Sequence, residues 1–269
     1  MVEYIKNLDP VILAFLAGVV TWLTTAFGAS VVFFQKQVSR KVFDTALGFA
    51  GGIMVSASFF SLLLPAIEGA GGRLMPPWLI VSSGFIIGCA FIYALDRIIP
   101  HLHPNMPAKE KEGIKTDLSF AYLLVLAITL HNIPEGLALG VTFGSLGSTA
   151  SVITIVSAGS LMWALALHNI PEGMAVSIPL RGSGLSKMRA FWFGQLSGAV
   201  LPLAALIGAV SVTGFEPLMP YALAFAAGAM MYVVVEEVIP ETQRAGNTDI
   251  ATLSFLAGIV VMMIFDMVL

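Results

Sequence analysis

Long apolar runs alternate with short polar segments along almost the whole chain. Eight of these runs come near or above the roughly 20 residues that a helix needs to cross a bilayer. They cover residues about 10–34, 44–67, 76–99, 118–143, 151–178, 189–212, 217–239 and 250–269. The fourth and fifth runs can span only if their polar residues face inward. The pattern predicts an all-α polytopic membrane protein, with residues 1–269 forming a single domain of eight transmembrane helices.

Composition supports this prediction. The chain has 58% hydrophobic and 11% charged residues and a mean hydropathy of +0.92, whereas soluble domains carry about 25% charged residues. The first apolar run is a full span without a small-residue cleavage pattern after it, so we expect it to remain in the protein. Cys89 is the single cysteine, which excludes intramolecular disulfides. We expect the lipid bilayer as a partner and no nucleic acid.

The basic residues fall mainly on one side of the predicted membrane. Positive residues favour the cytosolic side of membrane proteins. With eight spans, one side carries eleven of them: Lys36, Arg40, Lys41, Arg97, Lys109, Lys111, Lys115, Arg181, Lys187, Arg189 and Arg244. The other side carries only Lys6 and Arg73. This asymmetry predicts that both termini lie outside and that the polar segment at about 100–117 is a cytosolic loop.

Two sets of internal repeats relate the predicted helices. The six residues HNIPEG occur at 131–136 and again at 168–173, in the fourth and fifth helices. Residues 46–54 of the second helix match 222–230 of the seventh at six of nine positions. The third and eighth helices share the spacing of Phe85, Gly88 and Asp96 with Phe255, Gly258 and Asp266. Helices five apart cross in opposite directions, so we expect a 3+2+3 inverted repeat, in which transporters bind substrate near the midplane.

Each HNIPEG copy spaces its polar residues as a metal site does. Residues three and four apart share one face of a helix, so each copy offers three convergent ligands: His131, Asn132 and Glu135, then His168, Asn169 and Glu172. Pro134 and Pro171 remove one helical hydrogen bond each. Imidazole with carboxylate suits Zn²⁺ and other first-row divalent ions, whereas Mg²⁺ and Ca²⁺ prefer oxygen alone. We expect a four-coordinate site of two histidines and two glutamates; a hydrogen-bonded helix pair is the alternative.

Other polar residues have weaker support as an accessory metal pathway. On the cytosolic side, acidic residues either form an exit path or are solvated helix ends: Asp44, Asp96, Glu236, Glu237 and Glu241. Glu68 and Asp266 lie toward the outside, where they either attract cations or are plain surface charge. His101 and His103 form an HxH pair in the cytosolic loop, which would bind metal weakly. Met54 is a packing residue or a soft ligand.

Taken together, these motifs resemble the Zrt/Irt-like (ZIP) family of divalent metal transporters, closest to its bacterial GufA-like branch. The resemblance rests on the paired HNxPEG motifs, GFAGGIM and SLLLP in the second helix, QLSG in the sixth and EEVIPE in the seventh. It covers essentially the whole chain. It implies uptake of Zn²⁺, often with Fe²⁺, Mn²⁺, Co²⁺ or Cd²⁺, into the cytosol of a prokaryote through its plasma (inner) membrane, by a homodimer.

The resemblance also implies roles for single residues. The six motif residues would form the central site, with Met54 nearby, Ser61 toward the entrance, Asp44 and Glu237 toward the exit, and Glu68 and Asp266 on the outer side. One position departs from the family. Relatives with a two-metal centre commonly carry a Glu before the proline of helix 6, where this chain has Leu201. We therefore expect one strong metal site.

Two other classes of function compete with transport. An intramembrane zinc metalloprotease would carry HExxH, with the Glu acting on zinc-bound water, but Asn follows the His in both copies. A metal-binding sensor without flux is the second alternative, and the inverted repeat disfavours both. We expect no enzyme activity and no catalytic cofactor, with the ion as transported substrate. No GxxxxGK[ST] motif is present, so transport would use an ion gradient while one helix bundle rocks against another.

Overall fold

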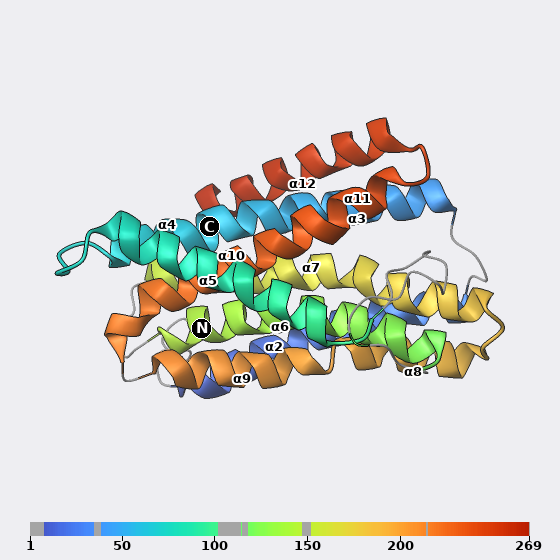
Figure 1. Ribbon diagram of the computed structural model, residues 1–269, viewed down its shortest axis with the longest axis horizontal. Coiled ribbons are helices and arrows are strands. Elements are labelled where there is room, and N and C mark those ends of the chain that lie inside the picture. Colours follow the sequence, from blue (N-terminus) through green and yellow to red (C-terminus); the bar gives the residue numbers. More distant parts are fainter. Residues whose placement is uncertain are drawn as a thin grey trace.

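A computed structural model of the protein describes residues 8–34, 39–101, 114, 118–146, 152–213 and 215–268. The elements of this part of the chain are helices that run along the long axis of the molecule (Figure 1). In chain order they are α2 (Pro10–Ala29), η1 (Ser30–Phe33), α3 (Arg40–Ala57), η2 (Ser58–Leu63), α4 (Leu64–Gly69), α5 (Pro77–Ile98), α6 (Phe120–Gly144), α7 (Val152–Gly182), α8 (Lys187–Ser197), α9 (Val200–Val212), η3 (Glu216–Leu218), α10 (Met219–Val233), η4 (Val234–Val238), α11 (Ile239–Gln243) and α12 (Thr248–Val268).

The helices confirm that this is an integral membrane protein. Seven described helical stretches are each long and apolar enough to cross a bilayer. The remaining long helix, α7, has 31 residues, which extend about 46 Å at 1.5 Å per residue and exceed a hydrocarbon core of about 30 Å. His168, Asn169 and Glu172 interrupt its apolar surface. These are polar residues of the fifth run, which we expected to span the membrane only if such residues face inward.

Two of the spanning helices contain a π-helical turn that the sequence did not reveal. In the second span η2 separates α3 from α4, and in the seventh η4 separates α10 from α11. Each π turn ends two residues before a proline, Pro65 or Pro240, whose missing N–H breaks the ordinary hydrogen-bond ladder. Such turns are frequent at functional sites. The two turns place Ser61 and the Glu236–Glu237 pair at irregular points of their helices.

Four helix pairs pack most closely: α12 along α3, α5 along α10, α6 along α9 and α2 along α7. In the first two pairs, glycine allows one backbone to touch the other. A Cβ atom on Gly52 would overlap the carbonyl of Phe255, and one on Gly228 would overlap that of Phe85. Both pairs bring two Phe-x-x-Gly segments together, 49–52 with 255–258 in the first pair and 85–88 with 225–228 in the second.

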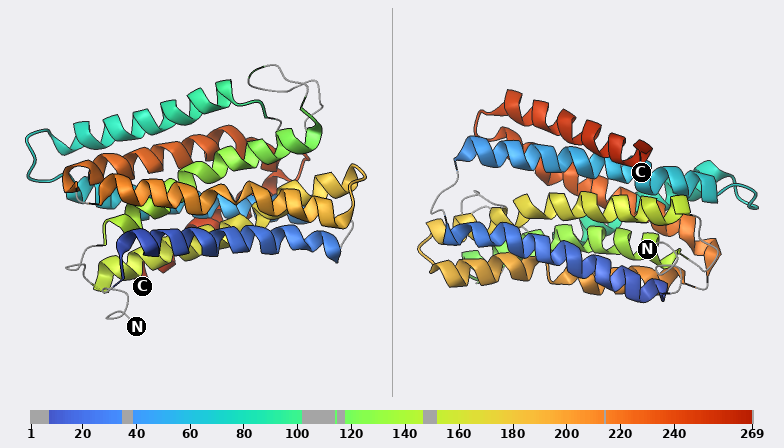
Figure 2. Two further views of the ribbon diagram at one scale, coloured as in Figure 1. Left: turned by 90° about the horizontal axis from the view of Figure 1, so that it is seen from below. Right: turned by 180° about the vertical axis from the view of Figure 1, so that it is seen from behind.

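The pairs are arranged so that α6 and α7 lie at the centre (Figure 1). α7 contacts α2 on one side and α3 on the other, while α6 contacts α9 on one side and α10 on the other. The start of α2, the end of α12 and the turn between α4 and α5 lie at one end of the molecule (Figure 2). The turns from α7 to α8 and from α11 to α12 lie at the other end. The two HNIPEG copies are therefore carried by the innermost helices.

Candidate metal site

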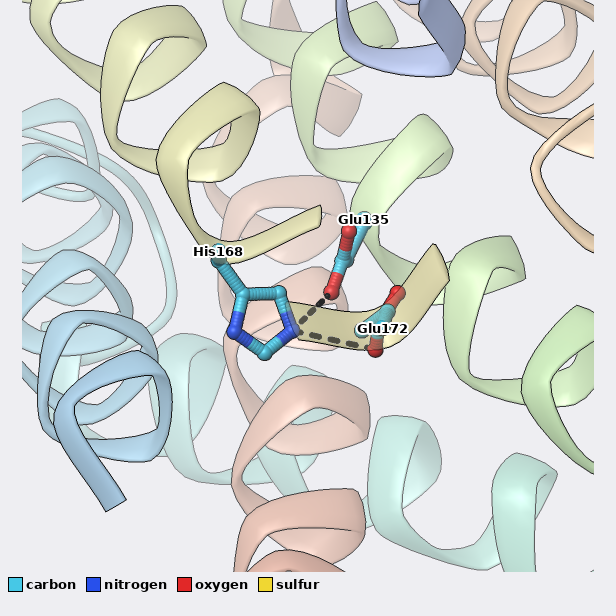
Figure 3. A group of neighbouring side chains, drawn as sticks. All are labelled: Glu135, His168 and Glu172. Atoms are coloured by element: carbon cyan, nitrogen blue, oxygen red, sulfur yellow. Dashed lines mark hydrogen bonds and ion pairs between the residues drawn. The ribbon is translucent and has the colours of Figure 1, made fainter. Parts of the chain in front are cut away.

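Three residues of the two HNIPEG copies converge between α6 and α7. His168 Nε2 lies 3.0 Å from Glu135 Oε1 and 3.1 Å from Glu172 Oε1 (Figure 3). Ligand atoms of these three residues all lie within 4.8 Å of one another. His168 and Glu135 are fully buried, and Glu172 is 3% exposed. These separations are short enough for all three residues to bind one metal ion.

Both helices continue through the prolines of the motif. Pro134 lies inside α6 and Pro171 inside α7. His168 and Glu172 are four residues apart, so the uninterrupted helix presents them on one face. Glu135 reaches the same point from the neighbouring helix. The expected convergence of the two copies is thus achieved by His168, Glu172 and Glu135.

Several polar atoms at this point have no protein partner. Among the described residues, no hydrogen bond reaches Glu135 Oε2, Glu172 Oε2 or His168 Nδ1 by distance and angle, while the Asn169 amide lies beside Glu135. Buried polar groups are nearly always hydrogen-bonded, and those left unpaired in a membrane cost several kcal/mol each. Such a concentration of unpaired oxygen and nitrogen atoms is explained if the cluster binds a cation.

The charge of the cluster selects the kind of cation. Two carboxylates carry a charge of −2, which balances one divalent ion and offsets most of the electrostatic cost of burying it. Imidazole nitrogen together with carboxylate oxygen suits Zn²⁺ and neighbouring first-row ions. The donor set therefore fits a divalent transition-metal ion.

His131 does not join this cluster. Its Nε2 forms an ion pair with Glu237 Oε1 of η4 at 2.5 Å. Asn132 is also engaged elsewhere, because its Nδ2 donates to the Ile128 carbonyl at 2.9 Å and to the Ser197 carbonyl at 3.2 Å. The structure thus brings together three of the six expected motif residues as an ion-paired group. It directs His131 toward a second acidic group.

That second group consists of Asp96 from α5 and Glu236 and Glu237 from η4, whose ligand atoms also lie within 4.8 Å of one another. His101 joins it, with Nε2 2.9 Å from Asp96 Oδ1 and Nδ1 2.8 Å from the Ile99 carbonyl. Burial by itself lowers the pKa of His101, but the hydrogen bonds to Asp96 and the Ile99 carbonyl, together with the charges of Asp96 and Glu237, outweigh it and raise the pKa to about 9. His101 is thus buried against Asp96, while His103 lies outside the described residues.

The residues that we expected on the outer side either pair with one another or are exposed. Ser61 Oγ, on the π turn η2, donates to Asp266 of α12 at 3.1 Å and 3.3 Å. Met54 is fully buried, as expected for a residue near the centre. Glu68 is exposed in α4. A serine and one aspartate therefore meet at the π turn η2, whereas three acidic residues gather at the π turn η4.

Asp44 is held by groups that the sequence analysis missed. Its Oδ1 lies 2.7 Å from Arg40 Nε, and its Oδ2 accepts from Asn247 Nδ2 at 2.9 Å. Arg40 also pairs with Glu241 at 2.9 Å. The spacing of Arg40 and Asp44, four residues apart on one helix, is a signal for such an ion pair. In the structure Asp44 therefore joins α3 to the segment between α11 and α12.

Leu201 is fully buried in α9. Its carbonyl oxygen would lie 2.8 Å from a Cβ atom placed on Gly136, so its backbone packs directly against the HNIPEG copy of α6. An aliphatic side chain contributes no metal ligand. The position where the family resemblance implies an acidic ligand in some relatives therefore carries a buried aliphatic side chain, on the helix that packs against α6.

Comparison with known proteins connects this geometry to a family. A family model described as ZIP Zinc transporter matches residues 108–266. The chain is 41% identical to the Zinc transporter ZIP11 of Bos taurus, over 96% of this chain and 97% of that protein. It is 36% identical to the Zinc transporter GufA of Myxococcus xanthus, over 93% and 96%, and 37% identical to the Zinc transporter ZIPB of Bordetella bronchiseptica, over 94% and 80%. The similarity therefore extends over nearly the whole chain.

Proposed function

Because the chain belongs to the ZIP zinc transporter family, we propose that it carries Zn²⁺ into the cytosol through the site on α6 and α7. The observation that carries this proposal is the cluster of Glu135, His168 and Glu172, buried between central helices with unpartnered polar atoms. Fe²⁺, Mn²⁺, Co²⁺ and Cd²⁺ are further candidate substrates, since the same ligands accept them. In this proposal Asn169 completes the ligand set.

The proposed topology has eight spans, a 3+2+3 inverted repeat and both termini outside. The repeat is supported by matching elements: π turns in the second and seventh spans, and Phe-x-x-Gly contacts in α3 with α12 and in α10 with α5. The orientation is supported by basic residues at the ends of helices that meet opposite the start of α2: Arg40, Arg97, Arg181, Lys187 and Arg244. Positive residues favour the cytosolic side.

The proposed path connects two acidic groups through the central site. On the outer side Glu68 attracts the ion, and Ser61 with Asp266 receives it. After binding at Glu135, His168 and Glu172, the ion moves toward His131, whose ion pair with Glu237 links the centre to the second acidic group. Glu236, Asp96 and His101 follow on the cytosolic side, and His103 is an accessory ligand. The increasing number of carboxylates favours movement inward.

The proposed motion is the rocking of one helix bundle against another. The first bundle contains α2, α6, α7, α8 and α9, and the second contains α3, α5, α10 and α12. Glycine contacts in which backbones touch join helices within each bundle, as Gly28 of α2 with Ile170 of α7, and Gly52 of α3 with Phe255 of α12. α3 with α7 and α10 with α6 form the interface between bundles. Such an interface allows alternating access around a fixed site.

We further propose one strong metal ion per protein, because Leu201 replaces an acidic ligand. Leu201→Glu is expected to create a second ion site and to raise the bound Zn²⁺ from one to two per chain. The added carboxylate would lie beside Gly136 and the existing cluster. Isothermal titration calorimetry of purified protein measures the stoichiometry, with Leu201→Gln as the matched uncharged control. An unchanged stoichiometry in Leu201→Glu contradicts this part of the proposal.

A homodimer in a prokaryotic plasma membrane completes the proposal. The prokaryotic plasma membrane rests on the resemblance to the GufA-like branch, since the relatives include vertebrate as well as bacterial proteins. The dimer rests on the family resemblance. Light scattering of the purified protein in detergent measures its mass, and a monomer at all concentrations would contradict the dimer.

Zn²⁺ flux into liposomes tests the proposed function directly. Vesicles that contain the purified protein and a trapped zinc-sensitive dye should accumulate Zn²⁺ far faster than empty vesicles. Competing Mn²⁺, Co²⁺ and Cd²⁺ rank the substrates. Tight Zn²⁺ binding without flux would favour a sensor or a structural metal site, and zinc-dependent peptide cleavage would favour the metalloprotease.

A further inference from the structure

α12 lies at the edge of the molecule, where it packs mainly along α3 (Figure 1). The two backbones touch in the first half of each helix, because a Cβ atom on Gly48 would lie 2.5 Å from the Ala251 carbonyl oxygen. Beside this contact a groove of about 450 Å³ runs between the two helices. Val42 and Ala257 of its lining are exposed, so the groove opens on the surface of the bundle that faces the bilayer.

The groove is long and narrow because of how its side chains are spaced. Two stripes of residues spaced four and then three apart line it: Val42, Ala46 and Phe49 on α3, and Ile250, Ser254 and Ala257 on α12. Residues at this spacing share one face of a helix. Ala46 and Ser254, in the middle of the stripes, are small and leave the space between them open. Each stripe extends about 10 Å along its helix, which is most of one leaflet of a hydrocarbon core about 30 Å thick.

The wall of the groove presents hydrocarbon even where its residues are polar. Thr45 Oγ1 donates to the Lys41 carbonyl at 2.8 Å, and Ser254 Oγ donates to the Ala251 carbonyl at 2.8 Å. Both hydroxyls are therefore satisfied by their own helices. A peptide in this groove would leave backbone groups unpaired at membrane depth, which is costly. An acyl chain has no such groups, so the lining favours a lipid tail over a polar ligand.

Lys41 borders the groove at the end where α3 begins. The neighbouring Arg40 is neutralised, since its guanidinium lies 2.7 Å from Asp44 Oδ1 and 2.9 Å from Glu241 Oε1. Lys41 is exposed and, within the described part of the chain, forms no ion pair. A lysine at the end of a transmembrane helix lays its stem along apolar surface and keeps its ammonium at the membrane surface. The groove thus joins a hydrocarbon wall to a positive charge that no described carboxylate neutralises.

We propose that the groove between α3 and α12 is a binding site for an anionic phospholipid. One acyl chain lies between the two apolar stripes, and the phosphate lies at the Lys41 ammonium. Basic residues beside grooves between transmembrane helices bind lipid head groups in this way. The site rests on α3 and α12 being membrane spans. The proposed orientation of the chain decides only that the lipid belongs to the cytosolic leaflet.

Native mass spectrometry tests the charged end of the site. The purified protein is titrated in detergent with phosphatidylglycerol, which is anionic, or with phosphatidylcholine of the same acyl chains, which has no net charge. We expect phosphatidylglycerol to bind more tightly to the wild type. Lys41→Gln should weaken its binding about fivefold, the effect of one lysine near the membrane surface. Binding of phosphatidylcholine should change much less, and Lys41→Arg should retain the wild-type preference because it keeps the charge.

The matched control is Arg189→Gln. Arg189 is also basic and exposed, but it lies in α8, outside the groove. This variant loses the same charge and should bind phosphatidylglycerol as the wild type does. Equal losses of affinity in Lys41→Gln and Arg189→Gln would overturn the site, because they would show only a general attraction of anionic lipid to the basic surface.

Filling the groove tests its apolar part. Ala257→Phe places a ring between the two stripes and should weaken the binding of both lipids severalfold, because the acyl chain loses its space. Ala90→Phe adds the same ring to an exposed alanine of α5, outside this groove, and should leave both affinities unchanged. Ala257 is exposed, so the variant should fold; Ala257→Leu is the smaller replacement if it does not. Unchanged lipid affinity in a folded variant at position 257 would overturn the proposal.

A second copy of the chain is the competing occupant of the groove. If Ala257→Phe converts a dimer into a monomer in light scattering and leaves lipid affinity unchanged, the groove is a contact between chains and the lipid site is wrong. None of these measurements needs zinc or transport. Failure of the lipid site is therefore distinguishable from failure of the proposed function.

Discussion

Glu135→Gln and Glu172→Gln should each abolish measurable Zn²⁺ uptake into proteoliposomes. Each substitution removes one of the two negative charges that balance a divalent ion between α6 and α7. A buried charge that loses its partner costs about 3–5 kcal/mol, which corresponds to a loss of at least about 100-fold in affinity. The glutamine keeps nearly the same volume, so the packing of the two helices should survive.

The control for this prediction is Asp249→Asn. Asp249 is an exposed acidic residue in the first turn of α12, away from the ion cluster. Asp249→Asn also replaces a carboxylate with an amide and removes one negative charge. This variant should take up Zn²⁺ at the wild-type rate. Calorimetric titration of Zn²⁺ separates lost binding from lost movement. Uptake at the wild-type rate in both Glu135→Gln and Glu172→Gln would refute the assignment of the site.

Gly173→Ala and Gly159→Ala should change stability in opposite directions, although both glycines lie in α7. A Cβ atom on Gly173 would overlap the Thr25 carbonyl of α2, so the alanine must push the two backbones apart. Overpacking of this kind destabilises by about 1–3 kcal/mol, occasionally more. Gly173 follows Glu172 directly, so the displacement should also reduce Zn²⁺ uptake.

Gly159 provides a matched control within the same helix. A Cβ atom there meets no described atom within 4 Å, and alanine is favoured over glycine in a helix by up to about 1 kcal/mol. Gly159→Ala should therefore leave the melting temperature unchanged or raise it, with normal uptake. Thermal melting of both variants in the same detergent measures the difference. If Gly173→Ala melts at or above the wild-type temperature, the close contact of α2 with α7 is wrong.

Much of the fold could be predicted from the order of apolar residues. The expected run at 76–99 became α5 (Pro77–Ile98), and the run at 118–143 became α6 (Phe120–Gly144). Such agreement is expected because the bilayer thickness sets the length of an apolar run. The inverted repeat that the sequence predicts for α3 with α10 and for α5 with α12 stays a prediction. The run at 189–212 was predicted as one helix, but Pro202 divides it into α8 and α9.

The sequence predicted which residues could form the candidate site, but it did not predict which of them would contact one another. The sequence identified the duplicated HNIPEG motif, and the structure brings His168, Glu172 and Glu135 from that set together. It did not indicate that His131 would meet Glu237, because these residues lie on helices far apart in the chain. Their contact depends on the π turn η4 and on the packing of α6 against α10.

The sequence by itself determined that the protein spans a membrane, which ionisable residues lie inside it and which motif is duplicated. These properties depend on local hydrophobicity and on short-range spacing. Only the tertiary structure decided which buried polar atoms meet a partner and which remain open to an ion. The Asp44 carboxylate is paired with Arg40 and Asn247, whereas Glu172 Oε2 meets no hydrogen-bond partner in the part of the chain that the structure describes. The physical reason is that each buried polar atom takes whatever donor or acceptor a neighbouring helix presents, and helix packing alone determines that neighbour.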